Sequence, residues 1–398
     1  MRTRKKEDFD LIGCFLFLFI LSKTGFLVSS IMEYVSLLIF SLLVVLRVLK
    51  SKTFMITKPT VYYLLFGGYV FLSYFWAMNK DFALETIYTM VALVVFMIVL
   101  SNYIYTKEKL RTVVKYLVLA NVLVSGKILL FYFFQNGTAA SRIISITGIH
   151  FNTVGQVIAF STLFSVYLYR VYKEKKYLYA IVPQLLAIVL TTSRKSLLIP
   201  IIGMIIVLLL EKRVSKLLKY LFLSFTGMVI FYLINPTLIS NILEKLGDLF
   251  KYAVGSETTD WSINLRDFFI QTGEEIFKHH PMIGIGVNNF AYYVGTFTSY
   301  GIARYSHNNY IELLSCLGIV GFMLYYWLYL YLLVKLRRRA SKNNPLHMIC
   351  FSILITLIIM EWGIVSYTGC MYHMYLLVIY YTLIFGEDIV LKKDGQNG

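Results

Sequence analysis

The sequence predicts an all-α, polytopic membrane protein. Of its 398 residues, 58% are hydrophobic and only 15% are charged, a composition too apolar for a soluble protein of several domains. Apolar runs of about 20 residues, the length an α-helix needs to cross a bilayer, recur along the chain. Short clusters of lysine and arginine separate these runs and account for most of the net charge of +17. That distribution is typical of cytoplasmic loops of membrane proteins and argues against a nucleic-acid partner.

About 12 apolar runs are candidate transmembrane helices. They are centred near Phe17, Phe40, Phe66, Val94, Val122, Phe160, Leu186, Met204, Gly227, Phe322, Ile355 and Ile379. Leu11–Cys14 superficially matches a lipoprotein cleavage box, but it precedes an apolar run instead of following one, so the first helix is expected to remain uncleaved. The four cysteines are too scattered for a disulfide framework or a CxxC metal pair.

The positions of the basic residues predict the orientation of these helices. Starting inside, the amino terminus and alternate loops hold 26 of the 38 lysines and arginines, and the other loops hold 10. Because basic residues gather in cytoplasmic loops, both termini are expected in the cytoplasm. Residues 1–398 then form a single membrane domain, and the long loop of residues 235–305 faces outward.

Two helices are predicted within this long loop. Apolar residues recur at helical spacing between Thr237 and Ala253, which predicts an amphipathic helix on the membrane or on the helix bundle. A second helix is predicted from Trp261 to Lys278 and ends at a His-His-Pro sequence. The glycines at 284 and 286 and the asparagine pair after them predict an irregular turn. No internal repeat is evident, which counts against the transporter folds built from repeats.

The turn that joins the seventh and eighth spans, TTSRKS at residues 191–196, concentrates polar groups on the outer side. Ser193 can cap the eighth helix, which puts Arg194 beside free backbone N–H groups at the positive end of a helix dipole. Such a place attracts an anion, and phosphate above all. The alternative is that Arg194 and Lys195 simply extend toward water at the outer membrane interface.

Two further outward-facing residues are candidates for chemistry. Arg266 lies on the second loop helix, where a surface arginine paired with a neighbouring acid is the alternative. His307 precedes Asn308 at the start of the tenth span. The positive helix dipole there disfavours the imidazolium, so a neutral imidazole can accept a proton or donate a hydrogen bond. A structural histidine at the membrane interface is the alternative.

These motifs together resemble the O-antigen ligase and polysaccharide polymerase superfamily of bacterial membrane glycosyltransferases. The superfamily carries an outward T-x-S-R turn, an arginine in a long outer loop, P-x-x-G-x-G-x-x-x-F, and H-N followed by G-x-x-G. The chain has the matching residues in the same order, from about 142 to 327: Thr191 to Arg194, Arg266, Pro281 to Gly286 with Phe290, and His307-Asn308 followed by Gly318 and Gly321. An earlier connection, Arg142 to Asn152 and Gly155, resembles a further element of the family.

The resemblance implies transfer of a glycan from an undecaprenyl-pyrophosphate carrier to a glycan acceptor, at the outer face of the bacterial cytoplasmic membrane. It implies no metal, nucleotide sugar or other cofactor. Arg194, Arg266 and His307 are expected to be catalytic. Substrate-binding roles are expected for Lys195, Arg142, Arg304, Asn308 and Asn152. Arginine suits this chemistry because guanidinium grips the oxygens of a pyrophosphate leaving group bidentately.

Within this family the preferred prediction is a polymerase that joins lipid-linked repeat units into capsule, exopolysaccharide or O-antigen. A ligase that moves a finished glycan to another acceptor is the first alternative, and a flippase for lipid-linked glycans is less favoured because it should carry its cations near the midplane. A flippase and a chain-length regulator are possible partners of a polymerase.

Four further ionisable residues lie outside these motifs. Asp8-Phe9-Asp10 is a literal D-x-D, but it stands on the inner side in a charged tail and is assigned no metal role. Lys127 and Glu361, both in apolar runs, can pair with each other, or Lys127 can line the path of the lipid phosphate.

Overall fold

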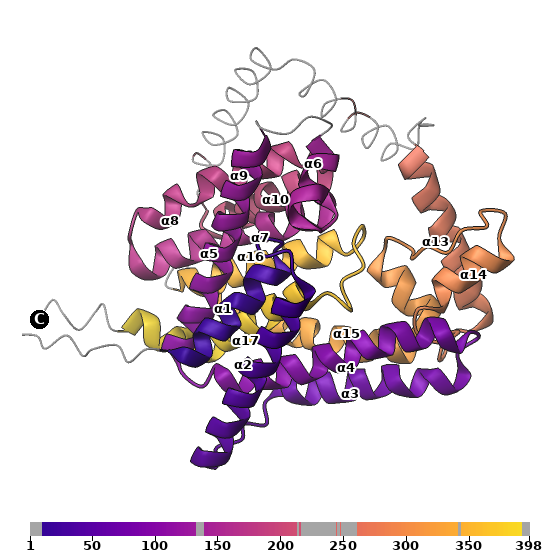
Figure 1. Cartoon of the computed structure of the whole chain (residues 1–398), viewed down its shortest axis with the longest axis horizontal. Helices are drawn as coiled ribbons and strands as arrows, with labels where there is room; N and C mark the ends of the chain where they lie inside the picture. Colours follow the sequence, from indigo (N-terminus) through magenta and orange to yellow (C-terminus); the bar gives the residue numbers. More distant parts are fainter. Residues whose placement is uncertain are drawn as a thin grey trace, which may run out of the picture. The chain divides into compact units, whose positions relative to one another are not determined.

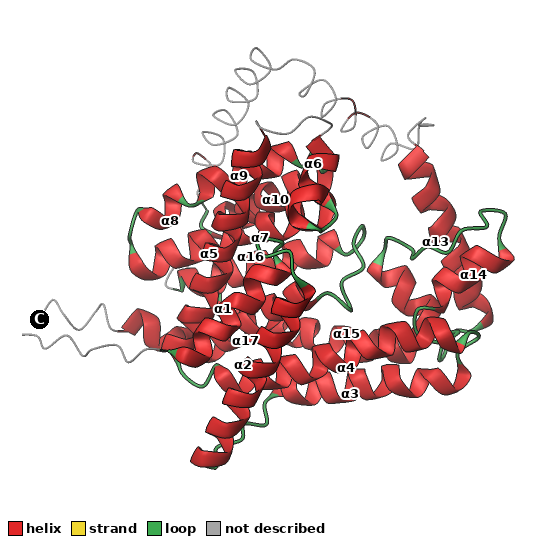
Figure 2. Ribbon diagram, in the orientation of Figure 1, coloured by secondary structure: helices red, strands yellow, loops and turns green. Residues whose placement is uncertain are grey.

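The computed structural model describes residues 10–132, 139–212, 261–340 and 344–391, together with the single residues 215, 244 and 247. Every regular element in these ranges is a helix, as Figures 1 and 2 show. The contacts divide the chain into two compact units. The first unit comprises Met1–Met55 and Val99–Thr191, and the second comprises Ile56–Ile98 and Thr192–Gly398.

The first unit is built around α5. Its helices are α1 (Leu11–Lys23), α2 (Ser30–Ser51), α5 (Lys107–Tyr132), α6 (Ala139–Thr147), α7 (Phe151–Tyr172), α8 (Lys176–Tyr179) and α9 (Ile181–Leu190). Helix α5 packs against α1, α6, α7 and α9, and α1 also packs against α2. The face of α5 that includes Leu110, Val114, Leu117 and Val124 is fully buried, so apolar burial holds this unit together.

The second unit is organised around α15 (Asn309–Arg339), a helix of 31 residues. Its other helices are α3 (Lys58–Leu72), the 3₁₀ turn η1 (Ser73–Trp76), α10 (Arg194–Leu210), α13 (Trp261–His279), α14 (Asn289–Phe297), α16 (Pro345–Met360) and α17 (Cys370–Leu391). Helix α4 (Lys80–Tyr103) begins in this unit and ends in the first. Helix α15 contacts α3, α13, α14, α16 and α17, and Figure 1 shows α3 running alongside it.

The helices fall where hydropathy predicts them. Each predicted centre lies within a helix, apart from Gly227, which is outside the described residues. Five helices in the described ranges are long and apolar enough to cross a membrane: α2, α4, α5, α7 and α15. Other apolar helices are shorter, such as the 13-residue α1, and at about 1.5 Å per residue it does not reach across the hydrocarbon core. The predicted number of about 12 spans is therefore not confirmed.

One face of α2 is apolar and uncovered. Ile31, Leu38 and Leu49 expose 73%, 69% and 68% of their surface. A soluble protein rarely leaves so long an apolar stripe in water, whereas lipid accepts it without cost. The helical architecture and this exposed stripe fit a membrane protein.

The long loop of residues 235–305 follows its predicted structure in part. Helix α13 matches the predicted helix at 261–278 and ends at the predicted His-His-Pro sequence. The predicted helix between Thr237 and Ala253 lies outside the described residues. The asparagine pair does not continue the irregular turn, because Asn289 opens the short helix α14. The reason is local: Asn288 takes φ +60°, which ends the turn and lets a helix begin at the next residue.

Candidate active site

The first turn of α10 carries two of the predicted site residues. Ser193 has an extended backbone conformation, and its hydroxyl accepts a long hydrogen bond from the N–H of Ser196 at 3.5 Å. It is therefore the N-cap of α10, as predicted, and Arg194 is the first residue of the helix. The Lys195 ammonium donates a hydrogen bond to the carbonyl oxygen of Gly363. A side chain at 363 would meet Lys195, since a Cβ there would lie 2.9 Å from Cε.

Arg266 on α13 belongs to the same positive cluster. The charges of both Arg266 and Arg194 act on the Lys195 ammonium. Two arginines from different helices thus lie within electrostatic range of Lys195. Like charges repel at short range, so an anion with several negative charges would relieve this repulsion when it binds.

His307 lies in a tight turn that leads into α15. Its φ is +58°, in the left-handed region that residues with a side chain rarely adopt. The Ser306 hydroxyl donates to the carbonyl of Asn308 at 2.7 Å and accepts from the Asn308 N–H at 3.2 Å. The buried Glu312 carboxylate accepts from the N–H of Ser306 at 2.7 Å. These bonds close the turn on both sides of His307 and hold its backbone.

The His307 ring contacts two aromatic rings. It stacks against Phe269 with ring centroids 6.1 Å apart, and it meets the tilted ring of Tyr305 with centroids 4.2 Å apart. Phe269 follows Arg266 by three residues on α13, which is nearly one helical turn. The structure therefore brings α13, with its arginine, to the same place as the His307 turn.

Tyr305 connects the positive cluster to this turn. Burial and the Glu312 carboxylate raise the pKa of the Tyr305 hydroxyl, whereas Arg304 and Arg266 act to lower it. The hydroxyl therefore stays protonated at neutral pH and can donate a hydrogen bond. Arg266 is therefore within electrostatic range both of Lys195 on α10 and of Tyr305 near the start of α15.

Asn308 is the N-cap of α15, and in the part of the chain that the structure describes only the oxygen of its side-chain amide is hydrogen-bonded. Its Oδ1 accepts hydrogen bonds from the N–H groups of Tyr310 at 3.0 Å and Ile311 at 3.2 Å. Only 2% of its surface is exposed. Within the described residues its Nδ2 has no hydrogen-bond partner. A buried donor of this kind is costly unless an oxygen accepts from it, and the substrate contact of Asn308 stays a prediction.

Two glycine motifs meet backbone to backbone and hold α13 against α15. Gly318 has φ +64° and ψ −170°, which breaks the helix inside α15. A Cβ on Gly318 would lie 2.3 Å from the carbonyl carbon of Met282, and one on Gly284 would lie 2.3 Å from that of Cys316. Side chains are excluded at both positions because two main chains touch there.

The break in α15 also frees backbone groups that the turn after α13 then uses. Ile285 and Gly286 donate to the carbonyls of Ser315 and Cys316 at 3.0 and 2.9 Å. In return, Ile319 donates to the carbonyl of Pro281 at 2.9 Å. The P-x-x-G-x-G and G-x-x-G sequences are thus two halves of one joint, which places the start of α15 beside α13.

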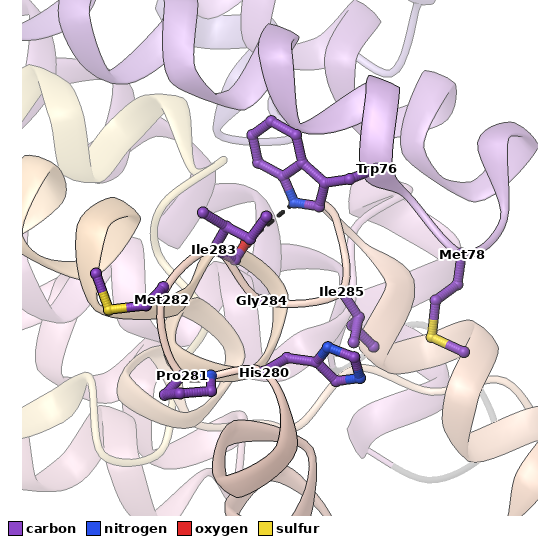
Figure 3. A pocket seen from close by; sticks show the side chains of 8 residues that line it. All are labelled: Trp76, Met78, His280, Pro281, Met282, Ile283, Gly284 and Ile285. Atoms are coloured by element: carbon purple, nitrogen blue, oxygen red, sulfur yellow. Dashed lines mark hydrogen bonds between the residues drawn. The ribbon is translucent and has the colours of Figure 1, made fainter.

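A pocket of ≈ 260 Å³ opens beside this joint, and Figure 3 shows its lining. The indole N–H of Trp76 donates to the carbonyl of Ile283 at 3.1 Å, the dashed line in Figure 3. The rest of the lining is mainly apolar: Met78, His280, Pro281, Met282, Gly284 and Ile285. The turn therefore presents an aromatic and apolar surface.

Two of the predicted substrate-binding residues belong to the first unit. Asn152 is half-buried in the first turn of α7, and its backbone N–H donates to Nδ1 of His150 at 3.3 Å. Arg142 lies in α6, and its side chain is outside the described residues. Arg304 belongs to the second unit and is exposed. The described structure thus gathers Arg194, Lys195, Arg266, Arg304, His307 and Asn308 in the second unit.

The remaining ionisable groups have structural partners. Asp10 caps α1, accepts from the hydroxyl of Tyr103 at 2.6 Å and pairs with Lys109 at 2.7 Å. Lys127 donates to the carbonyl of Phe26 at 2.9 Å in the first unit. Glu361, in the second unit, accepts from tyrosine hydroxyls. Each of these groups therefore has partners of its own.

Several residues that support the site could not be predicted from the sequence. Glu312, Phe269 and Tyr305 support the His307 turn, and Gly363 contacts Lys195. The one available signal was Glu312, an acid in the first turn of an apolar helix and five residues after His307. Such a residue needs a buried partner, although the sequence does not say which.

A family model matches part of the chain. Residues 179–326 match the family model described as O-antigen ligase. The matched range contains all six site residues of the second unit and both glycine motifs. It confirms the resemblance to the O-antigen ligase and polysaccharide polymerase superfamily and implies glycan transfer of the ligase or polymerase type, from a lipid-linked donor to an acceptor. No curated protein matches the chain.

Proposed function

We propose that the protein polymerises undecaprenyl-pyrophosphate-linked repeat units into a surface polysaccharide at the outer face of the bacterial cytoplasmic membrane. The observation that carries the proposal is the convergence of Arg194, Lys195 and Arg266 beside the His307 turn. Both termini are then cytoplasmic, and the product is a capsule, an exopolysaccharide or an O-antigen chain. No metal or nucleotide sugar takes part.

The chemistry follows from the charge of the leaving group. A hydroxyl oxygen of the acceptor attacks the anomeric carbon of the donor, and the bond from that carbon to the pyrophosphate oxygen breaks. The pyrophosphate departs with the electron pair, so negative charge develops where Arg194 and Arg266 can neutralise it. Bidentate contacts suit guanidinium for this task, and Lys195 adds a point charge.

His307 and Asn308 are assigned to the attacking hydroxyl and to the oxygens around it. A neutral imidazole at His307 can take the proton that the attacking hydroxyl loses. The free amide N–H of Asn308 can donate to an oxygen of the sugar or of the phosphate. The contacts of the His307 ring with Phe269 and Tyr305 restrict its orientation, as a proton acceptor requires.

The arginines provide the decisive experiment. Purified protein in lipid vesicles is supplied with a lipid-pyrophosphate-linked repeat unit, and polymer length and released undecaprenyl pyrophosphate are measured. Arg194→Ala and Arg266→Ala should each lower the rate about 10²–10³-fold, the usual loss when one charge-stabilising group is removed. Arg337→Ala, an exposed arginine in the last turn of α15, should leave the rate unchanged.

The products separate the possible activities. A polymerase makes a ladder of lengths from repeat units alone, whereas a ligase needs a second acceptor and leaves long polymer on the carrier in cells that lack it. Movement of the donor across the bilayer without bond formation would indicate a flippase. Unchanged polymer from both arginine variants would rule out the proposed site.

A further inference from the structure

We propose that the loop of residues 361–369, between α16 and α17, is a positioning element of the active site that ties the start of α10 to the start of α15. The inference rests on the proposed function. This loop lies beyond the residues that match the family model, which end at 326. It contacts two helix starts that carry site residues, through Gly363 on one side and through Ser366 and Tyr367 on the other.

On the α15 side the contact is made by Asn309, which directly follows His307 and Asn308. Asn309 is fully buried, and its backbone N–H donates to the carbonyl of Glu361 at 2.9 Å. Its Oδ1 accepts from the N–H groups of Ser366 at 2.9 Å and Tyr367 at 3.1 Å. One asparagine thus binds both ends of the loop and fixes them to the first residue of α15.

The base of the loop is held by the Glu361 carboxylate. Only 1% of Glu361 is exposed. Its carboxylate accepts hydrogen bonds from the hydroxyls of Tyr326 at 2.8 Å, Tyr329 at 2.7 Å and Tyr325 at 3.3 Å, and from Ser366. A buried carboxylate is costly without such donors, so this network strongly favours a single arrangement of the loop against α15.

On the α10 side the contact is the hydrogen bond from Lys195 to the carbonyl of Gly363. Gly363 has no side chain, so the lysine can lie directly against the loop backbone. Three residues separate Gly363 from Ser366, and three residues of extended chain span about 10 Å at most. The loop therefore limits how far the Lys195 ammonium can move from the start of α15.

This connection from Lys195 through Gly363 and Ser366 to Asn309, called the tie below, matters because the donor and the acceptor are held by different helices. In the proposed reaction, Arg194 and Lys195 on α10 face the pyrophosphate, while His307 faces the attacking hydroxyl. A shift of about 1 Å between such groups can cost 10²-fold in rate. Gly363, Ser366 and Asn309 are positioning residues and touch no substrate, whereas Lys195 also belongs to the proposed binding site.

The test uses Gly363→Ala, which changes the position of Lys195 at little cost to folding because the new methyl group meets a flexible side chain. In the vesicle assay with the lipid-pyrophosphate-linked repeat unit, kcat should fall at least tenfold, with KM changed less than about threefold. Gly68→Ala, at a helical glycine of α3 with open space around it, is the matched control and should keep wild-type kcat and KM.

A second variant addresses the other side of the loop. Asn309→Ala should lower kcat similarly among molecules that remain folded and monodisperse. Thr356→Val, which removes a buried hydrogen bond within α16, controls for a general loss of stability. A purely structural loop would reduce the folded yield and leave kcat per folded molecule unchanged, and that result would overturn the proposal.

A double variant shows whether the effect passes through Lys195. If it does, Gly363→Ala combined with Lys195→Ala should be no slower than Lys195→Ala alone. Losses in rate that multiply in the double variant would contradict the tie.

The two proposals can also fail separately. Active Arg194→Ala and Arg266→Ala variants would reject the proposed function, whereas inactive arginine variants with fully active loop variants would reject only the tie.

Discussion

His307 combines an unfavourable backbone conformation with a fully bonded turn. A left-handed φ at a residue with a side chain costs about 1–3 kcal/mol. The bonds from Ser306 to Asn308 and from Ser306 to Glu312 offset this cost. A strained residue that its surroundings hold in place is typical of a functional site. The turn itself thus supports a role for His307 beyond packing.

Asp10 offers a pH-dependent prediction at the same scale. Burial raises the pKa of its carboxyl, but Lys109, Tyr103 and the N–H of Gly13 outweigh this, so the pKa lies below the ordinary 3.8. The carboxylate then stabilises the fold above about pH 4, and this contribution is lost as the pH falls through the folded-state pKa. Asp10→Ala should cost about 1–2 kcal/mol at pH 7.

Thermal unfolding in one detergent at pH 7 and at pH 3 measures this effect. The difference between Asp10→Ala and the wild type should be smaller at pH 3 than at pH 7, because the unfolded chain binds its proton at a higher pH than the folded chain and the stabilisation falls across this range. Asp81→Ala, an exposed acid in the first turn of α4, should change stability by less than about 0.5 kcal/mol at either pH. A difference for Asp10→Ala that is equal at both pH values would contradict the ion pair.

At the scale of elements, the joint between the turn after α13 and the break in α15 determines how α13 lies against the first part of α15. Most helices resist a glycine with positive φ in their interior, because the break leaves carbonyl and N–H groups without partners. Here the turn at 281–286 supplies those partners. The break therefore persists, and the two site-bearing segments are joined through their main chains.

Gly284→Ala tests this joint. The new Cβ would lie within 2.5 Å of three backbone atoms of α15, and φ at this residue is +66°. Gly301→Ala is the matched control, because its φ is +65° but no atom lies within 4 Å. The control should lose only the cost of a left-handed alanine, about 1–2 kcal/mol. Gly284→Ala should lose about 3 kcal/mol more, or fail to fold.

Unfolding in detergent and folded yield compare the two variants. Equal losses from Gly284→Ala and Gly301→Ala would mean that the close backbone contact is unimportant. Gly318→Ala should behave like Gly284→Ala, since its Cβ would meet the backbone of Met282 and Ile283 at 2.3–2.5 Å.

The sequence was sufficient for the positions of the helices but insufficient for their junctions. Each predicted apolar centre within the described residues falls in a helix, whereas the short helices α6, α8 and α14 were not predicted. Residue type and order nominated Arg194, Arg266 and His307, whose roles stay predictions. The break at Gly318 was not foreseen, since a glycine in an apolar run is compatible with an intact helix. The tie from Asn309 to Ser366 could not be foreseen either, because 57 residues separate the two and nothing local marks the contact.

At the scale of the whole molecule, the charge distribution makes a prediction about orientation. Lysine and arginine gather in one set of alternate loops, which should lie in the cytoplasm. Ser51, between the second and third predicted spans, belongs to that set. Ser299 belongs to the long outer loop. Both serines are exposed, so cysteines at these positions can react with a reagent.

Labelling of intact cells with a membrane-impermeant thiol reagent tests the orientation. In a background with the four native cysteines replaced, Ser299→Cys should react in intact cells, and Ser51→Cys only after permeabilisation. The cysteine-free parent protein controls for other reactions. The reverse pattern would place the proposed site on the cytoplasmic side and exclude a donor presented at the outer face.

The joint between the two glycine motifs also bears on how such a protein diversifies. Main-chain atoms make the joint, so side chains that point away from it can change without altering the spacing between Arg266 and His307. Met282 and Ile283 are such side chains, with 60% and 44% of their surface exposed beside the pocket. Under the proposed function, mutation there changes the lining of the pocket while the charges proposed to receive the pyrophosphate keep their spacing. Such a protein can then acquire a new glycan preference without a change in its proposed donor chemistry.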